Sequence, residues 1–158
     1  MSGVVERLHA TVIAVGKRCA LIRGPSGAGK SDIALRCLAL GPSGLLANGA
    51  QLVADDQVII ERRASRLVAT APAQLRGKLE VRGVGILEVA AAEEADVVLV
   101  ADLVRAGPIE RLPGPWPTIH IMGLEVPLIQ LLPFEDSAHL KLLAALVMAA
   151  LPRVESKA

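Results

Sequence analysis

Aromatic side chains are almost absent from this chain, which has one Trp, one Phe and no Tyr among 158 residues. Proteins that bind single-stranded nucleic acid stack the bases on aromatic rings, so this shortage argues against that class. The formal net charge is only +1, and this balance gives no basic footprint for nucleic acid. We therefore expect no nucleic-acid partner.

Long hydrophobic runs are also missing, although 53% of the residues are hydrophobic. The longest unbroken apolar run, residues 142–151, is far shorter than the ~20 residues that span a membrane. The charged N-terminal stretch does not resemble a signal peptide. The two cysteines lack metal-binding or CxxC spacing, which predicts reduced, buried thiols. We expect a cytoplasmic protein with no membrane partner, and the excess of apolar residues suggests a homo-oligomer.

The chain does contain a complete Walker A pattern, G-x-x-x-x-G-K-[ST]. Glycines let backbone N–H groups converge on a phosphate oxygen, Lys30 can reach the β- and γ-phosphates, and the Ser31 hydroxyl can bind Mg²⁺. A short apolar strand precedes the loop and a helix over 31–40 follows it, as phosphate binding requires. The alternative is a glycine-rich turn before a helix. We predict nucleotide binding by Gly24, Pro25, Ser26, Gly27, Ala28, Gly29, Lys30 and Ser31.

Many short strands are expected between that helix and a second one over 138–151. Apolar residues cover nearly the whole circumference of the second helix, which predicts burial on more than one side or use as an interface. The pattern indicates one α/β P-loop domain over residues 1–158, with more strands than strict β-α alternation would give. The expected strands cover 4–15, 18–23, 51–54, 58–60, 67–70, 84–89, 97–103, 118–122 and 126–132, the last two forming a hairpin.

Acidic residues end two of these strands. Asp55 and Asp56 follow the strand 51–54, and Asp102 ends the strand that begins at Val97. Either position could supply the acid that holds Mg²⁺ beside a P-loop. Adjacent carboxylates suit a division of labour, with one for the metal and the other to take a proton from an attacking hydroxyl. The alternatives are an Asx-type loop for the pair and a polar strand stop for Asp102.

Three further residues could complete a phosphoryl-transfer site. Glu80 precedes two glycines that allow close backbone approach to a ligand, and it could be a further acid near Mg²⁺ or a solvated strand charge. His9 lies on the strand before the P-loop strand, where a structural role is the alternative. Arg111 could stabilise charge on the transferred group or lie in solvent.

Taken together, these segments resemble the catalytic domain of bacterial HPr kinase/phosphorylase, whose P-loop fold is related to phosphoenolpyruvate carboxykinase. The matching segments are 7–10, 24–31, 52–56 and 79–86, and the last of these, L-E-V-R-G-V-G-I, is close to the family signature. The resemblance implies ATP- and Mg²⁺-dependent phosphorylation of a serine of an HPr-type phosphocarrier of the phosphotransferase system. It also implies the reverse phosphorolysis by inorganic phosphate.

The resemblance further implies roles for individual residues. Lys30 would bind phosphate, Ser31 and Glu80 would hold Mg²⁺, and Asp55 would be the Walker-B-like neighbour of the nucleotide.

The catalytic roles are implied in the same way. Asp56 would accept the proton during phosphorylation and donate it in reverse, His9 would orient that acid, and Arg111 would contact the transferred phosphate.

The chain departs from the family pattern at three places. It begins almost at His9, like the short form that lacks the amino-terminal domain, and the alignment needs a loop insertion around residues 41–48. Glu135 and Ala138 stand where the family's late loop has arginines. Because phosphorolysis must hold inorganic phosphate among negative charges, we expect kinase activity with weak phosphorolysis.

Two other functions stay open. One is a small-molecule P-loop kinase that uses Asp102 as its metal acid, and the other is a nucleotide-gated regulatory module in which Asp56 is no longer a base. The presence of Lys30, Ser31, Asp56 and Glu80 together favours the protein-serine kinase.

Overall fold

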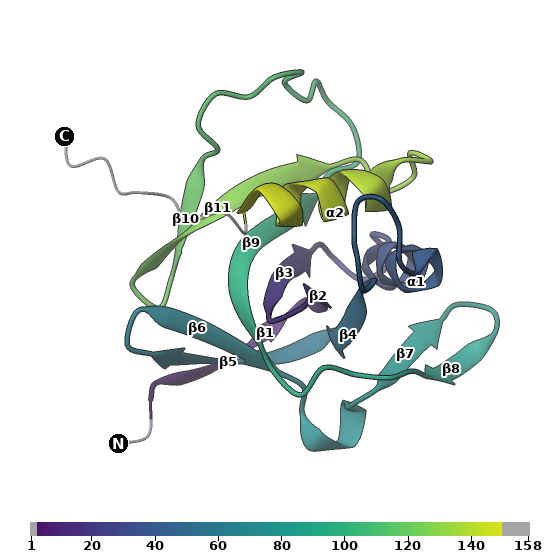
Figure 1. Ribbon diagram of the computed structural model, residues 1–158, viewed down its shortest axis with the longest axis vertical. Helices are drawn as coiled ribbons and strands as arrows, with labels where there is room; N and C mark the ends of the chain where they lie inside the picture. Colours follow the sequence, from purple (N-terminus) through teal and green to yellow (C-terminus); the bar gives the residue numbers. More distant parts are fainter. Residues whose placement is uncertain (1–2, 150–158) are drawn as a thin grey trace.

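The computed structural model describes residues 3–149, and its main element is a nine-stranded mixed sheet (Figure 1). The strands of the main path follow the order β1-β5-β6-β9-β3-β2-β4, while β11 also pairs with β9, and β10 pairs with β11. These strands are β1 (Val5–His9), β2 (Thr11–Val15), β3 (Arg18–Arg23), β4 (Gln51–Ala54), β5 (Gln57–Arg63), β6 (Arg66–Thr70), β9 (Ala95–Leu103), β10 (Thr118–Ile121) and β11 (Leu124–Leu131).

The central strand is β9, which pairs in parallel with β3 on one side and with β11 on the other. Its first two residues also pair antiparallel with β6. The apolar residues of β9 are largely buried, as expected for a strand covered on both faces. Because β3, β9 and β11 are parallel, their carboxyl ends meet at one edge of the sheet. The P-loop begins at this edge.

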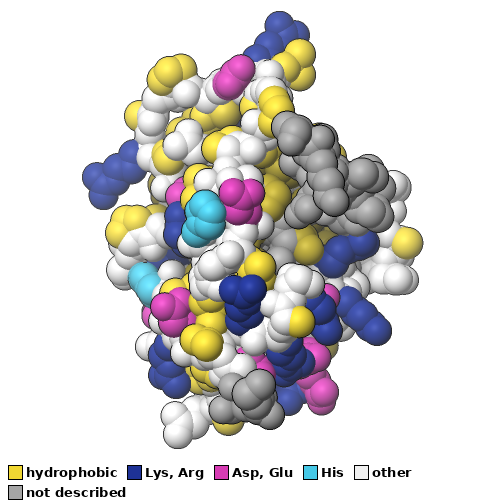
Figure 2. Space-filling view, turned by 90° about the vertical axis from the view of Figure 1, so that its left-hand side faces the viewer, with side chains coloured by type: hydrophobic (Ala, Val, Ile, Leu, Met, Phe, Trp, Pro, Cys, Tyr) yellow, Lys and Arg dark blue, Asp and Glu magenta, His cyan; other side chains and the backbone are white. Residues whose placement is uncertain are grey.

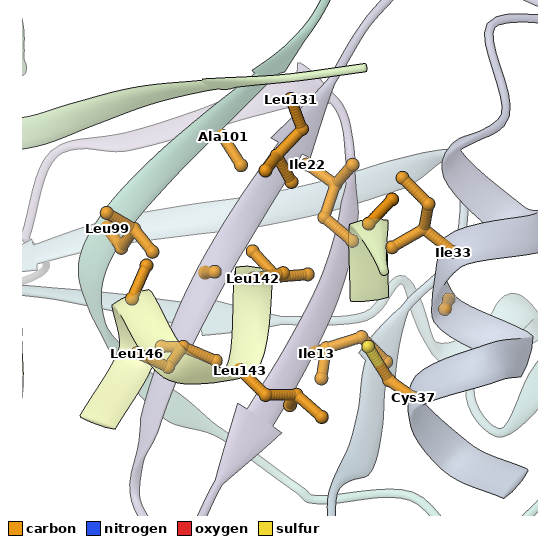
Figure 3. Packing of buried hydrophobic residues seen from close by; sticks show 14 of the residues in the cluster. Ile13, Ile22, Ile33, Cys37, Leu99, Ala101, Leu131, Leu142, Leu143 and Leu146 are labelled. Carbon is orange, nitrogen blue, oxygen red and sulfur yellow. The ribbon is translucent and has the colours of Figure 1, made fainter. Parts of the chain in front are cut away.

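Two helices pack on one face of the central strands. They are α1 (Lys30–Leu40) and α2 (Ala138–Ala149). Figure 3 shows side chains of both helices meeting those of β2, β3 and β9 in a continuous apolar core. The labelled members of this cluster are Ile13, Ile22, Ile33, Cys37, Leu99, Ala101, Leu131, Leu142, Leu143 and Leu146. A second buried cluster lies on the opposite side of the alternating strands and includes Leu21, Val100 and Val126.

The terminal helix is buried along one side. Ala138, Leu142, Leu143, Ala145 and Leu146 are covered, while other large apolar side chains of the same helix are exposed. The predicted final residues, 150–151, lie outside the described residues. Within residues 3–149, no helix is long and apolar enough to cross a membrane.

A separate hairpin stands beside α1. It consists of β7 (Lys78–Val81) and β8 (Gly85–Glu88), and a short 3₁₀ helix, η1 (Ala73–Leu75), precedes it. Contacts between β7 and α1 hold the hairpin next to the P-loop helix (Figure 1). The hairpin thereby brings the family-like signature segment to the same edge of the sheet.

The strand-rich α/β fold is confirmed, and most expected elements are found within a few residues of their expected bounds. The expected single strand over 4–15 is wrong, because the chain breaks at Ala10. The Ala10 N–H donates to the Asp56 carbonyl at 3.1 Å. At that point the chain changes partner, so that β1 pairs with β5 and β2 pairs with β4.

Candidate active site

The P-loop connects β3 to the N-terminus of α1. Gly27 and Gly29 have φ values of 82° and 107°, a left-handed conformation that favours glycine. The Lys30 side chain is buried, and its ammonium donates to the carbonyls of Gly24 at 2.8 Å and Pro25 at 3.1 Å. The loop thus curls around its own lysine at the positive end of the helix dipole, where an anion is stabilised.

Asp55 is a buried carboxylate that joins three elements. Its Oδ1 accepts hydrogen bonds from the Thr11 hydroxyl at 2.9 Å and the Ser31 hydroxyl at 2.7 Å. Its Oδ2 accepts the backbone N–H of Glu80 at 3.0 Å. The Walker A serine, the strand-end acid and the signature segment therefore meet at one point.

Asp56, the next residue, is more exposed than Asp55 and contacts His9. Its Oδ1 lies 2.5 Å from His9 Nε2, and both side chains are about half exposed. The backbone of Asp56 has φ of 67°, which is uncommon outside glycine. Two hydrogen bonds hold this turn, from the Asp56 N–H to the Thr11 hydroxyl and from the Gln57 N–H to the Asp55 carbonyl. The surrounding contacts therefore fix where the Asp56 carboxylate lies.

A pocket of about 400 Å³ opens along the P-loop. It brings together five of the predicted site side chains: Ser26, Lys30, Ser31, Asp56 and Glu80. A pocket of this size suits a small-molecule ligand. Its complete lining is Ser26, Gly27, Gly29, Lys30, Ser31, Asp32, Leu35, Asp56, Glu80, Val81, Arg82 and Phe134.

Two candidate residues from the sequence, Asp102 and Arg111, do not line the pocket that the described residues form. Asp102 accepts two hydrogen bonds from Arg23, at 2.7 and 2.8 Å, and this pairing raises the pKa of Arg23. Arg111 is exposed in the segment 104–117, between β9 and β10. The structure therefore does not include either of them among the described residues that line this pocket.

The loop between β11 and α2, residues 132–137 and hereafter the late loop, differs from its sequence-based interpretation. Glu135 forms an ion pair with Lys141 at 2.5 Å, and neither Glu135 nor Asp136 is among the lining residues of the pocket. The late loop instead contributes Phe134 to the pocket. These two acids therefore place no carboxylate among the described residues that line the pocket.

Sequence reasoning missed two contributors to this site, Thr11 and Phe134, and considered Arg82 only as a possible replacement for positive charge missing from the late loop. Thr11 holds both strand-end acids, Arg82 lines the pocket from the β7–β8 turn, and Phe134 lines it from the late loop. For Arg82, its place in the signature segment was an available signal. For Thr11 and Phe134 the decisive fact is strand pairing between distant segments, which the local pattern does not reveal.

The acids near the P-loop are oxygen donors, which hard divalent cations prefer. Among the described residues, no three His, Cys, Asp or Glu side chains gather closely enough to form a metal site by themselves. A divalent cation here would therefore also need the Ser31 hydroxyl and oxygens from the ligand. This arrangement is typical of Mg²⁺ bound together with nucleotide phosphates.

Comparison with known proteins finds matches to HPr kinase proteins. A family model described as the HPr Serine kinase C-terminal domain matches residues 3–155. Proteins named HPr kinase/phosphorylase match from Chlorobium limicola, at 36% identity over 138 residues, and from Chlorobium phaeobacteroides strain BS1, at 34% over 139 residues. These matches cover 80% and 81% of this chain, and the chain spans 39% of the length of each of these curated relatives.

A solved structure is also similar. It is described as the Hpr(Ser) kinase/phosphatase from Coxiella burnetii and has 26% sequence identity and a TM-score of 0.74. The match covers 89% of this chain and 93% of that chain. The likeness therefore extends over nearly the whole fold described above.

Proposed function

The chain belongs to the HPr serine kinase C-terminal domain family, and on this premise we propose that it transfers the γ-phosphoryl group of ATP to a serine of an HPr-type phosphocarrier. The observation that best supports this proposal is the convergence of Ser31, Asp55 and Asp56 beside the P-loop. Phosphoryl transfer needs a phosphate cradle, a metal-binding acid and a proton acceptor in one place.

Nucleotide binding is assigned to residues 24–31, with Asp55 as their neighbour. The backbone N–H groups of this loop would surround the phosphates, and Lys30 would turn from its carbonyl partners toward them. Ser31, Asp55 and Glu80 supply hydroxyl and carboxylate oxygens that fit Mg²⁺. When bound, Mg²⁺ would neutralise charge that develops on the phosphate oxygens.

Proton transfer is assigned to Asp56. As the serine oxygen attacks the γ-phosphorus, the bond from that phosphorus to the bridging oxygen breaks and ADP leaves. The serine proton passes to the Asp56 carboxylate. His9 contacts the Oδ1 atom of the same carboxylate. His9 thus positions the base, and Oδ2 of Asp56 is the proposed acceptor atom. Reversal of these steps, with inorganic phosphate as the attacking group, is phosphorolysis.

The rival assignments have less support. Asp102 is engaged by Arg23 and lies outside the pocket lining, which disfavours a small-molecule kinase that uses it as metal acid. A purely regulatory module would not need the Asp56–His9 pair at the pocket. We further propose a cytoplasmic location and a homo-oligomeric assembly, on the sequence arguments given above.

The test is transfer of label from γ-labelled ATP to purified HPr-type carriers in the presence of Mg²⁺. We expect labelled phosphoserine on a carrier and none on the same carrier with its acceptor serine replaced by alanine. Lys30→Ala in the enzyme is the matched negative control. Labelling of a small metabolite but of no carrier would support the small-molecule kinase. Nucleotide binding without any transfer would support the regulatory module.

A further inference from the structure

We propose that Phe134 is the surface on which the base of the bound nucleotide stacks, and that Arg36 holds it in position. This inference rests on the proposed function only in requiring that the P-loop binds a nucleoside triphosphate. It assigns a ligand contact to the chain's single phenylalanine.

Phe134 lies over the second half of the P-loop. A Cβ built on Gly29 would be 3.6 Å from Cε1 and 3.8 Å from Cζ of the ring, and 3.1 Å from the Cβ of Pro133. The ring lines the pocket, yet Phe134 is 77% exposed. An exposed ring fixed at the rim of a ligand pocket offers apolar area that a ligand can cover.

Sheet topology places the ring on the opposite side of the P-loop from the acids. Strand β3, which leads into the P-loop, lies between β9 on one side and β2 on the other. Beyond β9 is β11, which leads into Phe134, and beyond β2 is β4, which leads into Asp55 and Asp56. Strand β11 is parallel to β9, which is parallel to β3, and β4 is antiparallel to β2, which is antiparallel to β3. Strands β3, β4 and β11 therefore run in the same direction and end at the same edge of the sheet.

This arrangement indicates which way the bound nucleotide lies across the P-loop. The reacting γ-phosphate belongs beside Asp56 and the metal-binding oxygens. The base is at the other end of the nucleotide and therefore extends toward the flank that carries Phe134. Leu35 and Val81 add apolar side chains to the pocket lining.

Arg36 fixes the late loop on both sides of the ring. Arg36 lies in the second turn of α1, and its guanidinium donates to the carbonyls of Pro133, at 2.5 Å, and Glu135, at 3.0 Å. An ion pair with Asp32 at 3.0 Å orients the same guanidinium. The helix that begins at the P-loop thus holds the backbone on both sides of Phe134, so this part of the loop is positioned before the ligand binds.

The test compares ATP with inorganic tripolyphosphate, which has the phosphates but no base. Calorimetry in Mg²⁺ would measure both affinities for the unaltered chain, Phe134→Ala and Phe134→Trp. We expect Phe134→Ala to weaken ATP binding about 10-fold, within the usual range for losing one base–aromatic stack. Tripolyphosphate binding should not change, and Phe134→Trp should retain ATP affinity. Leu112→Ala, which removes an 83% exposed apolar side chain from the segment 104–117, is the matched control.

Arg36 is tested as a positioning residue by a double-mutant cycle. Arg36→Gln should weaken ATP binding when Phe134 is present and have little further effect in the Phe134→Ala background. Additive losses would show that Arg36 does not act through the ring. Thermal unfolding of each variant would separate these effects from loss of the fold.

The outcomes distinguish this inference from the proposed function. Unchanged ATP affinity in Phe134→Ala, or an equal loss for tripolyphosphate, overturns the stacking role and leaves nucleotide binding intact. A raised KM for the carrier with unchanged ATP affinity would assign the ring to the protein substrate instead. If the unaltered chain binds neither ATP nor tripolyphosphate, the proposed function fails as well.

Discussion

The backbone of Asp56 shows how local contacts prepare a side chain for chemistry. A non-glycine residue with φ of 67° needs neighbours that enforce this conformation. Here the Thr11 hydroxyl accepts a hydrogen bond from the Asp56 N–H, and the Ala10 N–H donates one to the Asp56 carbonyl. Neither contact uses the carboxylate, so the turn does not depend on the charge of the side chain.

Asp56→Asn is therefore expected to preserve the fold, and asparagine tolerates the left-handed region well. It should retain ATP binding and lower phosphoryl transfer by about 100-fold or more, because a positioned base is lost. Initial rates with labelled ATP and carrier measure this. Asp102→Asn is the control, since Asp102 pairs with Arg23 outside the pocket lining. Full activity in Asp56→Asn with loss in Asp102→Asn would transfer the role to the β9 acid.

The two buried thiols make stability depend on pH in the alkaline range. Burial raises the pKa of Cys37 to about 12, and burial, with a smaller contribution from Asp96, raises the pKa of Cys19 further. In the unfolded chain both thiols ionise near pH ~8.5. Their contribution is therefore fully present below that pH and is lost as the pH rises, because only the unfolded state releases the protons.

We expect the free energy of unfolding to fall above pH 9 by up to about 1.4 kcal/mol per pH unit for each thiol. Cys37→Ala should show a shallower fall, since only Cys19 then contributes. Denaturant melts in reducing buffer between pH 8 and pH 10 provide the measurement. Parallel pH dependences in the two proteins would contradict a buried, neutral Cys37.

At the scale of elements, helices and strands set by local sequence could be predicted, while features set by contacts between distant segments could not. The strand over 18–23 and the helix after it were predicted almost to the residue, because the Walker A pattern and apolar periodicity are local signals. The break at Ala10 was not predicted, since it depends on β5 and β4, which lie more than 40 residues away. The place of Phe134 likewise depends on β11 joining β9. Asp55, Asp56 and Glu80 were predictable as candidates, while Arg111 was selected without knowledge of where the segment 104–117 lies.

Neither the late loop nor the start of α2 brings a cation into the pocket formed by the described residues. Lys141 pairs with Glu135, and burial together with the nearby Arg36 lowers the pKa of His139, which favours its neutral form. The pocket cations that remain are Lys30 and Arg82. Since phosphorolysis must hold inorganic phosphate among other anions, this supply of positive charge is small.

We therefore expect kinase activity to exceed phosphate-dependent dephosphorylation by a wide margin, and Arg82→Gln to remove most of the residual phosphorolysis. Adding inorganic phosphate to the phosphorylated carrier and enzyme, then measuring pyrophosphate, tests both statements. Val84→Ala, in the same β7–β8 turn, is the control. Rapid release of pyrophosphate by the unaltered chain would contradict the first expectation. Rapid release by Arg82→Gln would show that another cation serves the site.

At the scale of the whole molecule, the distribution of charged and of exposed apolar side chains bears on how the chain contacts other proteins. On the face in Figure 2, Lys and Arg side chains are interspersed with Asp and Glu side chains. Ion pairs between neighbouring strands and within them include Arg63 with Glu61 on β5, and Arg66 of β6 with Asp96 of β9. Among the exposed large apolar side chains, one group of three lies on α2 and another group of three lies in the β7–β8 hairpin, while the others are scattered over other segments. The second of these lies beside the pocket, so α2 is the better candidate for contact between subunits.

The solution mass is expected to be a multiple of the 16.5 kDa chain, with α2 at the contact. Leu140, Val147 and Met148 are 40%, 40% and 58% exposed and lie on one side of this helix, as their spacing of seven and eight residues requires. Full burial of one such side chain contributes about 1.5–3 kcal/mol, so replacing Met148, the most exposed of the three, by lysine should lower the mass measured by sedimentation. Val84→Lys, on the hairpin turn beside the pocket, should leave the mass unchanged, because the proposed contact between subunits lies on α2. A monomer at all concentrations would refute the assembly, and dissociation by Val84→Lys alone would move the contact to the hairpin.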